Sequence, residues 1–461
     1  MLKSLALAAL MGASSVLAVE CHRGLKCPKA TPCCSQYGEC GVGAFCLGGC
    51  DPTTSFSLDS CAPAPVCKSK DLKFDSLDRV VNINKYLGDA SKADWVVSGE
   101  PAQHEGNMLL TMPKGSVGTV VSSTTYMWYG NVKARLKTSR GRGVVSAFIL
   151  FSDVKDEIDY EFVGVDLETA QTNFYYHGIP NYENSENITI TDSFSNFHDY
   201  EIRWTPDKIE WLIDGKSGRI QERKDTWNKT AQNYAFPQTP ARVQLSLWPG
   251  GLESNPKGTV DWAGGLIDWN HPDIKKPGYF YVEVESVSIE CYDGKDGLGT
   301  NNGKSYIYDD ISGTNDTVVD GDKKTILASL QATGLDMDKG KKEDDDKDDD
   351  KDDDKDDDKD SDKDDDKDDD KDDDKDDAPT VPGGSTGSGE HEESSNQDDS
   401  GSDSSVPGGG GSSGSPPEGY DTGSFDQGLD EGSKDGGGNA GTKSSASALA
   451  MIIAGGALYW L

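Results

Sequence analysis

The chain has 461 residues and a formal net charge of −37 at pH 7, with 82 Asp and Glu residues against 45 Lys and Arg residues. So strong a negative charge disfavours the phosphate backbone of nucleic acids, and we expect no nucleic-acid partner. Only 34% of the residues are hydrophobic, so part of the chain cannot contribute to a packed core.

The N-terminus is typical of a secretion signal. The stretch MLKSLALAALMGASSVLA has a Lys near its start, an apolar run and a small-residue ending. We therefore expect residues 1–18 to be removed after Ala18, and the mature chain to reach a compartment that permits disulfides.

All ten cysteines follow this signal, nine of them between Cys21 and Cys67. Because nine is odd, complete pairing requires one of them to bond the tenth, Cys291, while the other pairings stay open. Zinc binding is not expected in a secreted chain, so we predict no metal site. The predicted disulfide residues are Cys21, Cys27, Cys33, Cys34, Cys40, Cys46, Cys50, Cys61, Cys67 and Cys291.

Residues 19–67 contain the stretch CPKATPCCSQYGECGVGAFCLGGC, which resembles the hevein-type chitin-binding module. In that family a serine and three aromatic residues form a shallow platform for N-acetylglucosamine. The resemblance implies that Ser35, Tyr37 and Phe45 occupy three of these positions. The fourth is Glu39 rather than an aromatic residue, so a purely structural disulfide module remains the alternative.

Residues 68–294 consist of short stretches with strand-like alternation, separated by turn residues. Examples are the buried pattern GVVSAFILFS, the hairpin pattern DYEIRWTPDKIEWLIDGKSGRIQE and the strand YFYVEVESVSIECY. No long segment with helical period appears, so we predict an all-β sandwich of two packed sheets. Trp204 and Trp211 fall on strands and are expected in the core or in a cleft wall, not in catalysis.

The stretch DEIDYEFVG, residues 156–164, alternates acids with apolar residues. Successive side chains of a strand point to opposite faces, so one face would carry acids and the other would pack in the core. The predicted acidic set is Glu157, Asp159 and Glu161, and the predicted core set is Ile158, Tyr160 and Phe162. Asp156 would point away from the acidic face.

No Lys or Arg relieves the repulsion among these three acids, so one carboxyl group is expected to keep its proton to higher pH. A protonated acid beside an ionised one is what cleavage of a glycosidic bond requires. The simpler alternative is a solvated strand face.

The stretch DEIDYEF resembles the E-x-D-x-E motif of glycoside hydrolase family 16, whose fold is a β-jelly roll. The stretches QTNFYYHG, FHDYEIRWTPDKIEWLIDG and SLWPGGLESNPKGTVDWAGGLIDW resemble blocks of its fungal Crh subfamily. Those proteins are anchored cell-wall transglycosylases that join chitin to β-glucan. The resemblance implies a jelly-roll catalytic domain over residues 68–294.

The family pattern implies that Glu157 is the nucleophile, Glu161 the general acid/base and Asp159 an auxiliary acid. It also implies that Gln171 and Asn173 contact the donor-side sugar, with ordinary cross-strand hydrogen bonding as the alternative. Their spacing of two places both on one strand face.

Trp248 and Trp262 lie in Gly- and Pro-rich stretches that we predict to be turns, where they could stack on sugars. Burial in the sandwich is the alternative. His177 and His198 show no ligand-like spacing and are expected to be structural.

Three functions fit this sequence. The first is a transglycosylase that transfers chitin to β-glucan, the second is an endo-acting hydrolase with the same triad, and the third is a non-catalytic wall-binding protein. The acidic triad favours an enzyme, because a lectin needs no such repelling set. We expect chitin and β-glucan as partners, no cofactor and a monomer.

Beyond the sandwich, residues 295–342 are expected to be a domain extension or linker. Residues 343–377 hold 26 acids and eight Lys with no apolar residue, and residues 378–439 continue as Gly, Ser and acids. Both stretches are predicted to be disordered.

The C-terminus has small residues around Asn439, a short polar spacer and an apolar ending. This is typical of a glycosylphosphatidylinositol signal, with residues 440–461 removed and Gly437 or Gly438 as alternative acceptors. Such an anchor would attach the chain to the membrane. Three sequons predict N-glycosylation at Asn187, Asn228 and Asn315.

Overall fold

The computed structural model describes residues 19–294 and 298–341. The predicted signal peptide, the Asp/Lys tract, the Gly/Ser stalk and the anchor signal with Asn439 lie outside the described residues. Among the residues that are described, no helix combines the length and apolar character needed to cross a bilayer.

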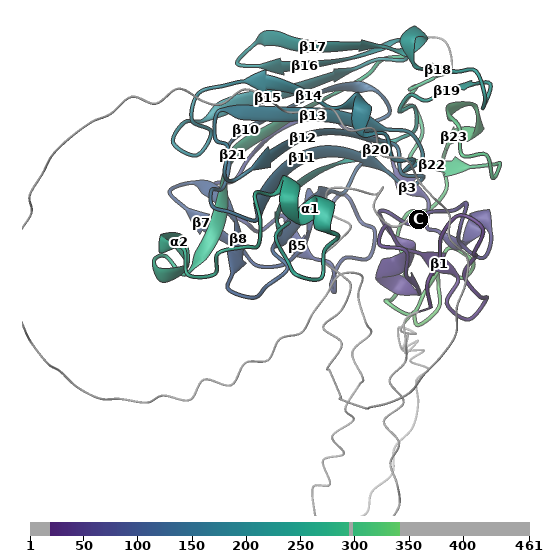
Figure 1. Ribbon diagram of the computed structural model, residues 1–461. Coiled ribbons are helices and arrows are strands. Elements are labelled where there is room, and N and C mark those ends of the chain that lie inside the picture. The colour runs from purple at the N-terminus through teal and green to yellow at the C-terminus, as the bar shows by residue number, and fades with distance from the viewer. Residues whose placement is uncertain (1–18, 295–297, 342–461) are drawn as a thin grey trace, which may run out of the picture. The chain divides into compact units, whose positions relative to one another are not determined.

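Two eight-stranded sheets form the body of the protein (Figure 1). The first, sheet A, is mostly antiparallel and has the strand order β14-β13-β12-β11-β20-β9-β6-β5. Its strands are β5 (Val80–Asn82), β6 (Trp95–Ser98), β9 (Thr119–Ser123), β11 (Val144–Ser152), β12 (Glu157–Val163), β13 (Thr169–Tyr175), β14 (Glu186–Thr189) and β20 (Ala241–Pro249).

The second sheet, sheet B, follows the path β17-β16-β15-β10-β21-β8-β7, with β4 also paired to β21. Its strands are β4 (Lys70–Lys73), β7 (Pro101–His104), β8 (Asn107–Pro113), β10 (Gly130–Lys137), β15 (His198–Trp204), β16 (Lys208–Ile213), β17 (Lys216–Glu222) and β21 (Tyr279–Cys291). The prediction of an all-β jelly-roll sandwich is confirmed.

The core fills the space between the two sheets, where apolar residues alternate inward along each strand. On β12 the predicted core set is confirmed: Ile158, Tyr160 and Phe162 are 1%, 0% and 2% exposed. The Tyr160 hydroxyl donates to the carbonyl oxygen of Leu212, so its burial leaves no unsatisfied polar group. Each such buried side chain stabilises the fold by about 1.5–3 kcal/mol.

The remaining elements are short. The strands are β1 (Cys33–Cys34), β2 (Cys40–Gly41), β3 (Ala64–Pro65), β18 (Trp227–Asn228), β19 (Asn233–Tyr234), β22 (Ser305–Tyr308) and β23 (Val318–Gly321). The helices are α1 (Lys257–Trp262) and α2 (Pro272–Lys275), with 3₁₀ turns at Gly43–Cys46, Leu58–Ser60, Tyr182–Asn184, Arg223–Thr226 and Asn315–Thr317.

The segment after sheet B is an extension of the fold, not a free linker. Strand β22 pairs with β23 on one side and with β3 on the other in a three-stranded sheet, beside the Cys-rich segment in Figure 1. Further on, Leu327 and Ala332 enter the core of residues 33–50, and both are 0% exposed. The Cys-rich segment, called the module below, therefore shares its core with a segment almost 300 residues away in the sequence.

All ten cysteines form disulfides: Cys21–Cys34, Cys27–Cys40, Cys33–Cys46, Cys50–Cys61 and Cys67–Cys291. Cys67 is thus the member of the cluster that bonds Cys291, at the end of β21. Because a group formed by Cys21, Cys27 and Cys34 consists of disulfide sulfurs, it offers no thiolate to a metal.

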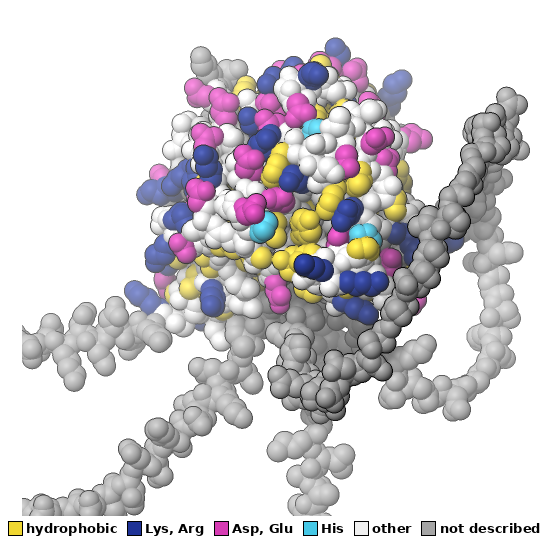
Figure 2. All heavy atoms as spheres, turned by 90° about the vertical axis from the view of Figure 1, so that its left-hand side faces the viewer, with side chains coloured by type: hydrophobic (Ala, Val, Ile, Leu, Met, Phe, Trp, Pro, Cys, Tyr) yellow, Lys and Arg dark blue, Asp and Glu magenta, His cyan; other side chains and the backbone are white. Residues whose placement is uncertain are grey.

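On the face shown in Figure 2, acidic and basic side chains are interspersed among apolar patches. This face has no single-sign area of the kind that attracts a polyanion.

Candidate active site

Strand β12 carries the acidic triad on the face of sheet A that is turned away from the core. Glu157, Asp159 and Glu161 are 2%, 1% and 8% exposed. A solvated acidic face is therefore excluded, because three carboxyl groups in a row are removed from bulk water. Their burial costs free energy unless the charges are suppressed or compensated.

Glu161 is a carboxyl group of the triad whose surroundings favour its protonated form. Burial raises its pKa well above the ordinary 4.5, and the neighbouring charges of Asp159 and Glu157 raise it further. Its Oε1 atom has no hydrogen-bond partner among the described residues. Like-charge repulsion was predicted as the cause of such a shift, but burial makes the larger contribution.

Burial also raises the pKa of Asp159 to about 7, against the opposing effect of the Arg219 charge. Arg219 lies on β17 and is 5% exposed. Its guanidinium donates to the carbonyl and hydroxyl oxygens of Thr172 at 2.8 and 2.9 Å. No local pattern predicted this buried cation, because its position relative to the triad depends on how the two sheets pack.

Strand β13 supplies polar side chains next to the triad. Glu161 pairs with Gln171 and Asp159 pairs with Asn173 in the antiparallel register, so both predicted sugar contacts lie on the triad face. Asn173 Nδ2 donates to the Tyr175 hydroxyl at 2.7 Å. Tyr175, opposite Glu157, was missed by sequence reasoning, although its spacing from Asn173 could have identified it.

The two predicted tryptophans come together at the Glu161 end of this face. Their ring centroids are 6.1 Å apart, and Trp262 Nε1 donates to Gln171 Oε1 at 2.8 Å. The prediction that both lie in turns was wrong, because Trp248 is on β20 and Trp262 ends α1. Trp248 is only 3% exposed, packed with Val145 and Val163, whereas Trp262 is half-buried.

Other singled-out residues are structural. Trp204 and Trp211 are 1% and 0% exposed and belong to the main core, as predicted. Asp156 lies just before β12, where its side chain accepts hydrogen bonds from the backbone N–H groups of His177, Gln238 and Thr239.

The two histidines are held by hydrogen bonds within the fold. The His177 ring lies 3.1 Å from the carbonyl oxygen of Gly313, and the His198 ring lies 2.7 Å from Asp214 Oδ2.

The module residues do not form an exposed platform. Ser35, Tyr37 and Phe45 are 3%, 9% and 8% exposed. The Ser35 hydroxyl accepts hydrogen bonds from the backbone N–H groups of Tyr37 and Glu39, which is a local structural role. The open sugar-binding surface implied by the hevein resemblance is thus closed in this structure.

Of the three predicted glycosylation sites, Asn187 and Asn228 are exposed and Asn315 is half-buried. Asn187 lies on β14 directly opposite Gln171. A glycan there would lie at the sheet edge nearest to the triad.

A carboxyl group that burial keeps protonated, beside two further acids on one strand face, is the arrangement of enzymes that cleave glycosidic bonds. Residues 89–264 match the family described as "Glycosyl hydrolases family 16". The fold and the site therefore define the class as glycosidases of this family.

Comparison with individual relatives places the chain more narrowly within this family. The chain is 60% identical to "Crh-like protein 3" of Botryotinia fuckeliana over 73% of this chain and 76% of that protein. It is 48% identical to "Congo red hypersensitive protein 2" of Saccharomyces cerevisiae over 70% of each chain. A solved structure titled "Crh5 transglycosylase in complex with NAG" is 30% identical, with a TM-score of 0.48 over 59% of this chain and 99% of that one. The chain belongs to the fungal Crh-like cell-wall glycosidases and transglycosylases of glycosyl hydrolase family 16.

Proposed function

We propose that the protein transfers chitin to β-glucan by a retaining mechanism, with Glu157 as nucleophile, Glu161 as general acid/base and Asp159 as auxiliary acid. The observation that carries this proposal is that Glu157, Asp159 and Glu161 share one buried strand face, on which burial and the neighbouring charges raise the pKa of Glu161. The match to family 16 and the Crh-like relatives support the reaction class.

In the first step a Glu157 carboxylate oxygen attacks the anomeric carbon of the donor sugar. The bond from that carbon to the glycosidic oxygen breaks, and the Glu161 proton passes to the departing oxygen. The products are a covalent glycosyl ester on Glu157 and a shortened chain with a new hydroxyl group. The charge of Asp159, when that group is ionised, raises the pKa of Glu161 and would help to keep Glu161 protonated.

In the second step ionised Glu161 removes the proton from an acceptor hydroxyl group. The acceptor oxygen attacks the anomeric carbon and releases the Glu157 carboxylate, so both catalytic groups return to their first state. A glucan hydroxyl in this role gives a chitin–glucan link, and water gives hydrolysis. Transfer therefore depends on binding the acceptor, and the Trp262–Gln171 contact beside Glu161 supports a sugar-binding role for that corner.

The test offers a chitin oligomer as donor and a fluorescent β-1,3-glucan oligomer as acceptor. Transfer moves the fluorescence into larger products, which mass spectrometry identifies as mixed chains. New reducing ends without larger fluorescent products would make the enzyme a hydrolase. If the folded protein turned over none of the saccharides, a non-catalytic wall-binding function would be the alternative that remains.

The two ends of the sequence support secretion and a glycosylphosphatidylinositol anchor at Asn439 as part of this proposal, which would place the enzyme at the wall. Release of the protein from intact cells by a phosphatidylinositol-specific phospholipase tests the anchor. Retention on the cells after this treatment, with a known anchored protein released in parallel, would contradict it.

A further inference from the structure

The residues of the module that resemble a sugar platform face sheet A at close range. Ser35, Tyr37 and Phe45 line a cavity of about 30 Å³ together with four residues of β6 and β9. A space of this size holds one or two water molecules and no sugar ring. The sheet residues that close it are Val96, Ser98, Val120 and Ser122.

These sheet residues lie on the same face as the triad. Reading across the sheet from β12, Asp159 pairs with Ile149, Ile149 with Gln244 and Gln244 with Ser122. Directly paired residues share a face, so the module covers the triad face over β20, β9 and β6. Two strand spacings separate Gln244 from Asp159, which is roughly 10 Å.

Gln36 is the module side chain that reaches this row. Its Oε1 atom accepts hydrogen bonds from Gln244 Nε2 at 3.1 Å and from Arg242 Nη2 at 2.7 Å. All three side chains are buried, at 8%, 3% and 6% exposure. Gln36 therefore stands across the face of sheet A, in line with the middle acid of the triad.

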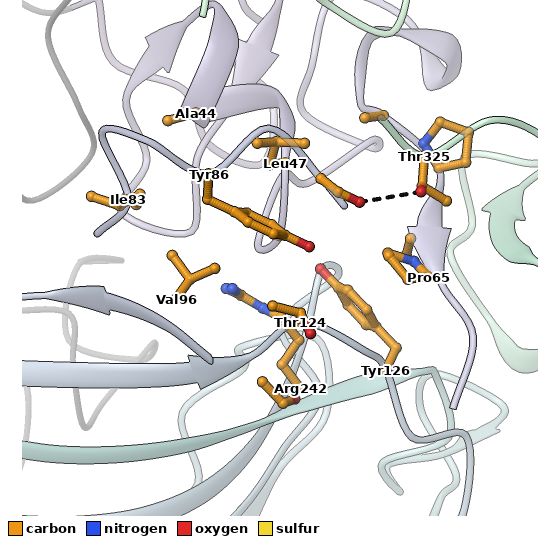
Figure 3. A pocket seen from close by; sticks show the side chains of 16 residues that line it. Ala44, Leu47, Pro65, Ile83, Tyr86, Val96, Thr124, Tyr126, Arg242 and Thr325 are labelled. Carbon is orange, nitrogen blue, oxygen red and sulfur yellow. Dashed lines mark hydrogen bonds between the residues drawn. The ribbon is translucent and has the colours of Figure 1, made fainter. Parts of the chain in front are cut away.

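Close packing and hydrogen bonds hold the module against sheet A. A Cβ atom at Gly48 would lie 2.5 Å from Arg242 Nη1, and one at Gly49 would lie 2.7 Å from Nη2, so a side chain at either position would require the guanidinium to shift. The Gly49 backbone N–H donates to Asp153 Oδ1 at 2.9 Å and to the Tyr126 hydroxyl at 3.0 Å. Figure 3 shows the side chains of Arg242 and Tyr126 pointing toward Tyr86, with Leu47 beyond it.

We propose that the triad face of sheet A forms the saccharide groove, with the docked module as its end wall, and that Gln36 determines how many sugar units fit between the triad and β20. This inference rests on the proposed glycosyl transfer. On the opposite side of the triad, sheet A continues through β13 to its edge strand β14. The groove is thus limited on one side of the triad, and the module acts through substrate length and not as a separate chitin-binding unit.

The test uses the full chain and a series of chitin oligomers of increasing length, with cleavage positions mapped by mass spectrometry. For the wild type, one of the two fragments keeps a fixed length as the donor is lengthened. Gln36→Ala shortens the end wall, so that the fixed fragment gains at least one sugar unit. Gln36→Glu keeps the volume and sets a carboxylate beside Arg242, so it should reproduce the wild-type fragments. Lys29→Ala, an exposed change on the module, is the control for nonspecific effects.

Gln36→Asn replaces Gln36→Ala in this test if the alanine variant fails to fold. Asn keeps the amide group of Gln, but its side chain is shorter by one methylene group. It should lengthen the fixed fragment in a smaller share of the products. Identical fragment lengths in the wild type and in every folded Gln36 variant would overturn the end wall while leaving glycosyl transfer intact. A wild-type enzyme without turnover would overturn the proposed function and the end wall with it.

Discussion

Trp211 donates a hydrogen bond from its indole Nε1 to the backbone carbonyl oxygen of Asp159, at 3.0 Å. This bond joins sheet B to the middle of the acidic strand through the core. It fixes the backbone between the two proposed catalytic glutamates, and the separation of such carboxyl groups decides how a glycosidase works.

Trp211→Phe is therefore expected to impair both folding and catalysis. The buried Asp159 carbonyl loses its donor and the core loses volume, so the free energy of unfolding should fall by about 1–3 kcal/mol. Turnover should also fall, because the acidic strand gains freedom. Trp204→Phe is the matched control, since Trp204 makes an equivalent bond to the Pro237 carbonyl oxygen away from the triad. Equal losses of turnover in both folded variants would contradict a positioning role for Trp211.

Glu161→Gln should abolish turnover and stabilise the fold at neutral pH. The folded-state pKa of Glu161 is raised above the unfolded value of 4.5, so ionisation favours the unfolded state as pH rises past that value. Each pKa unit of the difference costs the wild type about 1.4 kcal/mol at high pH. The variant escapes this cost, and the two proteins should become equally stable below a pH of about 4.5.

Denaturant unfolding on either side of this pH measures the effect. Glu253→Gln, at an exposed position, is the control and should change stability at neither pH. A Glu161→Gln protein that is no more stable than the wild type at neutral pH would mean that Glu161 is not buried as a protonated acid.

Asp159→Asn should reduce turnover less than Glu157→Gln and should shift its pH dependence. The charge of Asp159 raises the pKa of Glu161, so its removal lets Glu161 ionise at lower pH. The alkaline limb of the profile of kcat/KM against pH should move to lower pH, because ionised Glu161 cannot protonate the leaving oxygen. If Asp159→Asn is active and its alkaline limb lies at the same pH as that of the wild type, the limb reports the ionisation of a group other than Glu161.

A glycan on Asn187 is expected to hinder long substrates. Asn187 is exposed on the edge strand, opposite Gln171, so an attached glycan lies at the open side of the triad face. Asn187→Gln should raise turnover of polymeric chitin more than turnover of short oligomers. Asn228→Gln is the control, since Asn228 belongs to the separate β18–β19 pair. The same response to both substitutions would contradict a role for the position of the glycan.

Local alternation was enough to predict the faces of β12, because a strand fixes the direction of each side chain relative to its neighbours. It could not predict that the acidic face is buried, since that depends on segments distant in sequence. The glycines after Trp248 suggested a turn, but β20 runs to Pro249 before they begin. Arg219 was missed for a similar reason, because it reaches Thr172 across 47 residues of sequence.

The cysteine pattern predicted a small disulfide-bonded module but not its place. Its docking depends on Arg242, which is 206 residues from Gln36 in the sequence. The residues after 294 showed no periodic pattern, yet Leu327 completes the module core. Contacts of this range follow from the tertiary fold and carry no local signature.

The pairing of residues 325–341 with the module also determines how the protein responds to mechanical load. Any pull on the chain beyond residue 341 first peels this segment from the module, breaking bonds such as those from Gly43 N to Ala332 O and from Gly334 N to Ser60 O. The next contacts along the chain are those of β23 and β22, which pair with each other and, through β22, with β3, and only then β21, whose end the Cys67–Cys291 disulfide ties to residue 67. The acidic strand lies in the interior of sheet A, away from these contacts, so the C-terminal segment can detach from the module while the triad keeps its geometry.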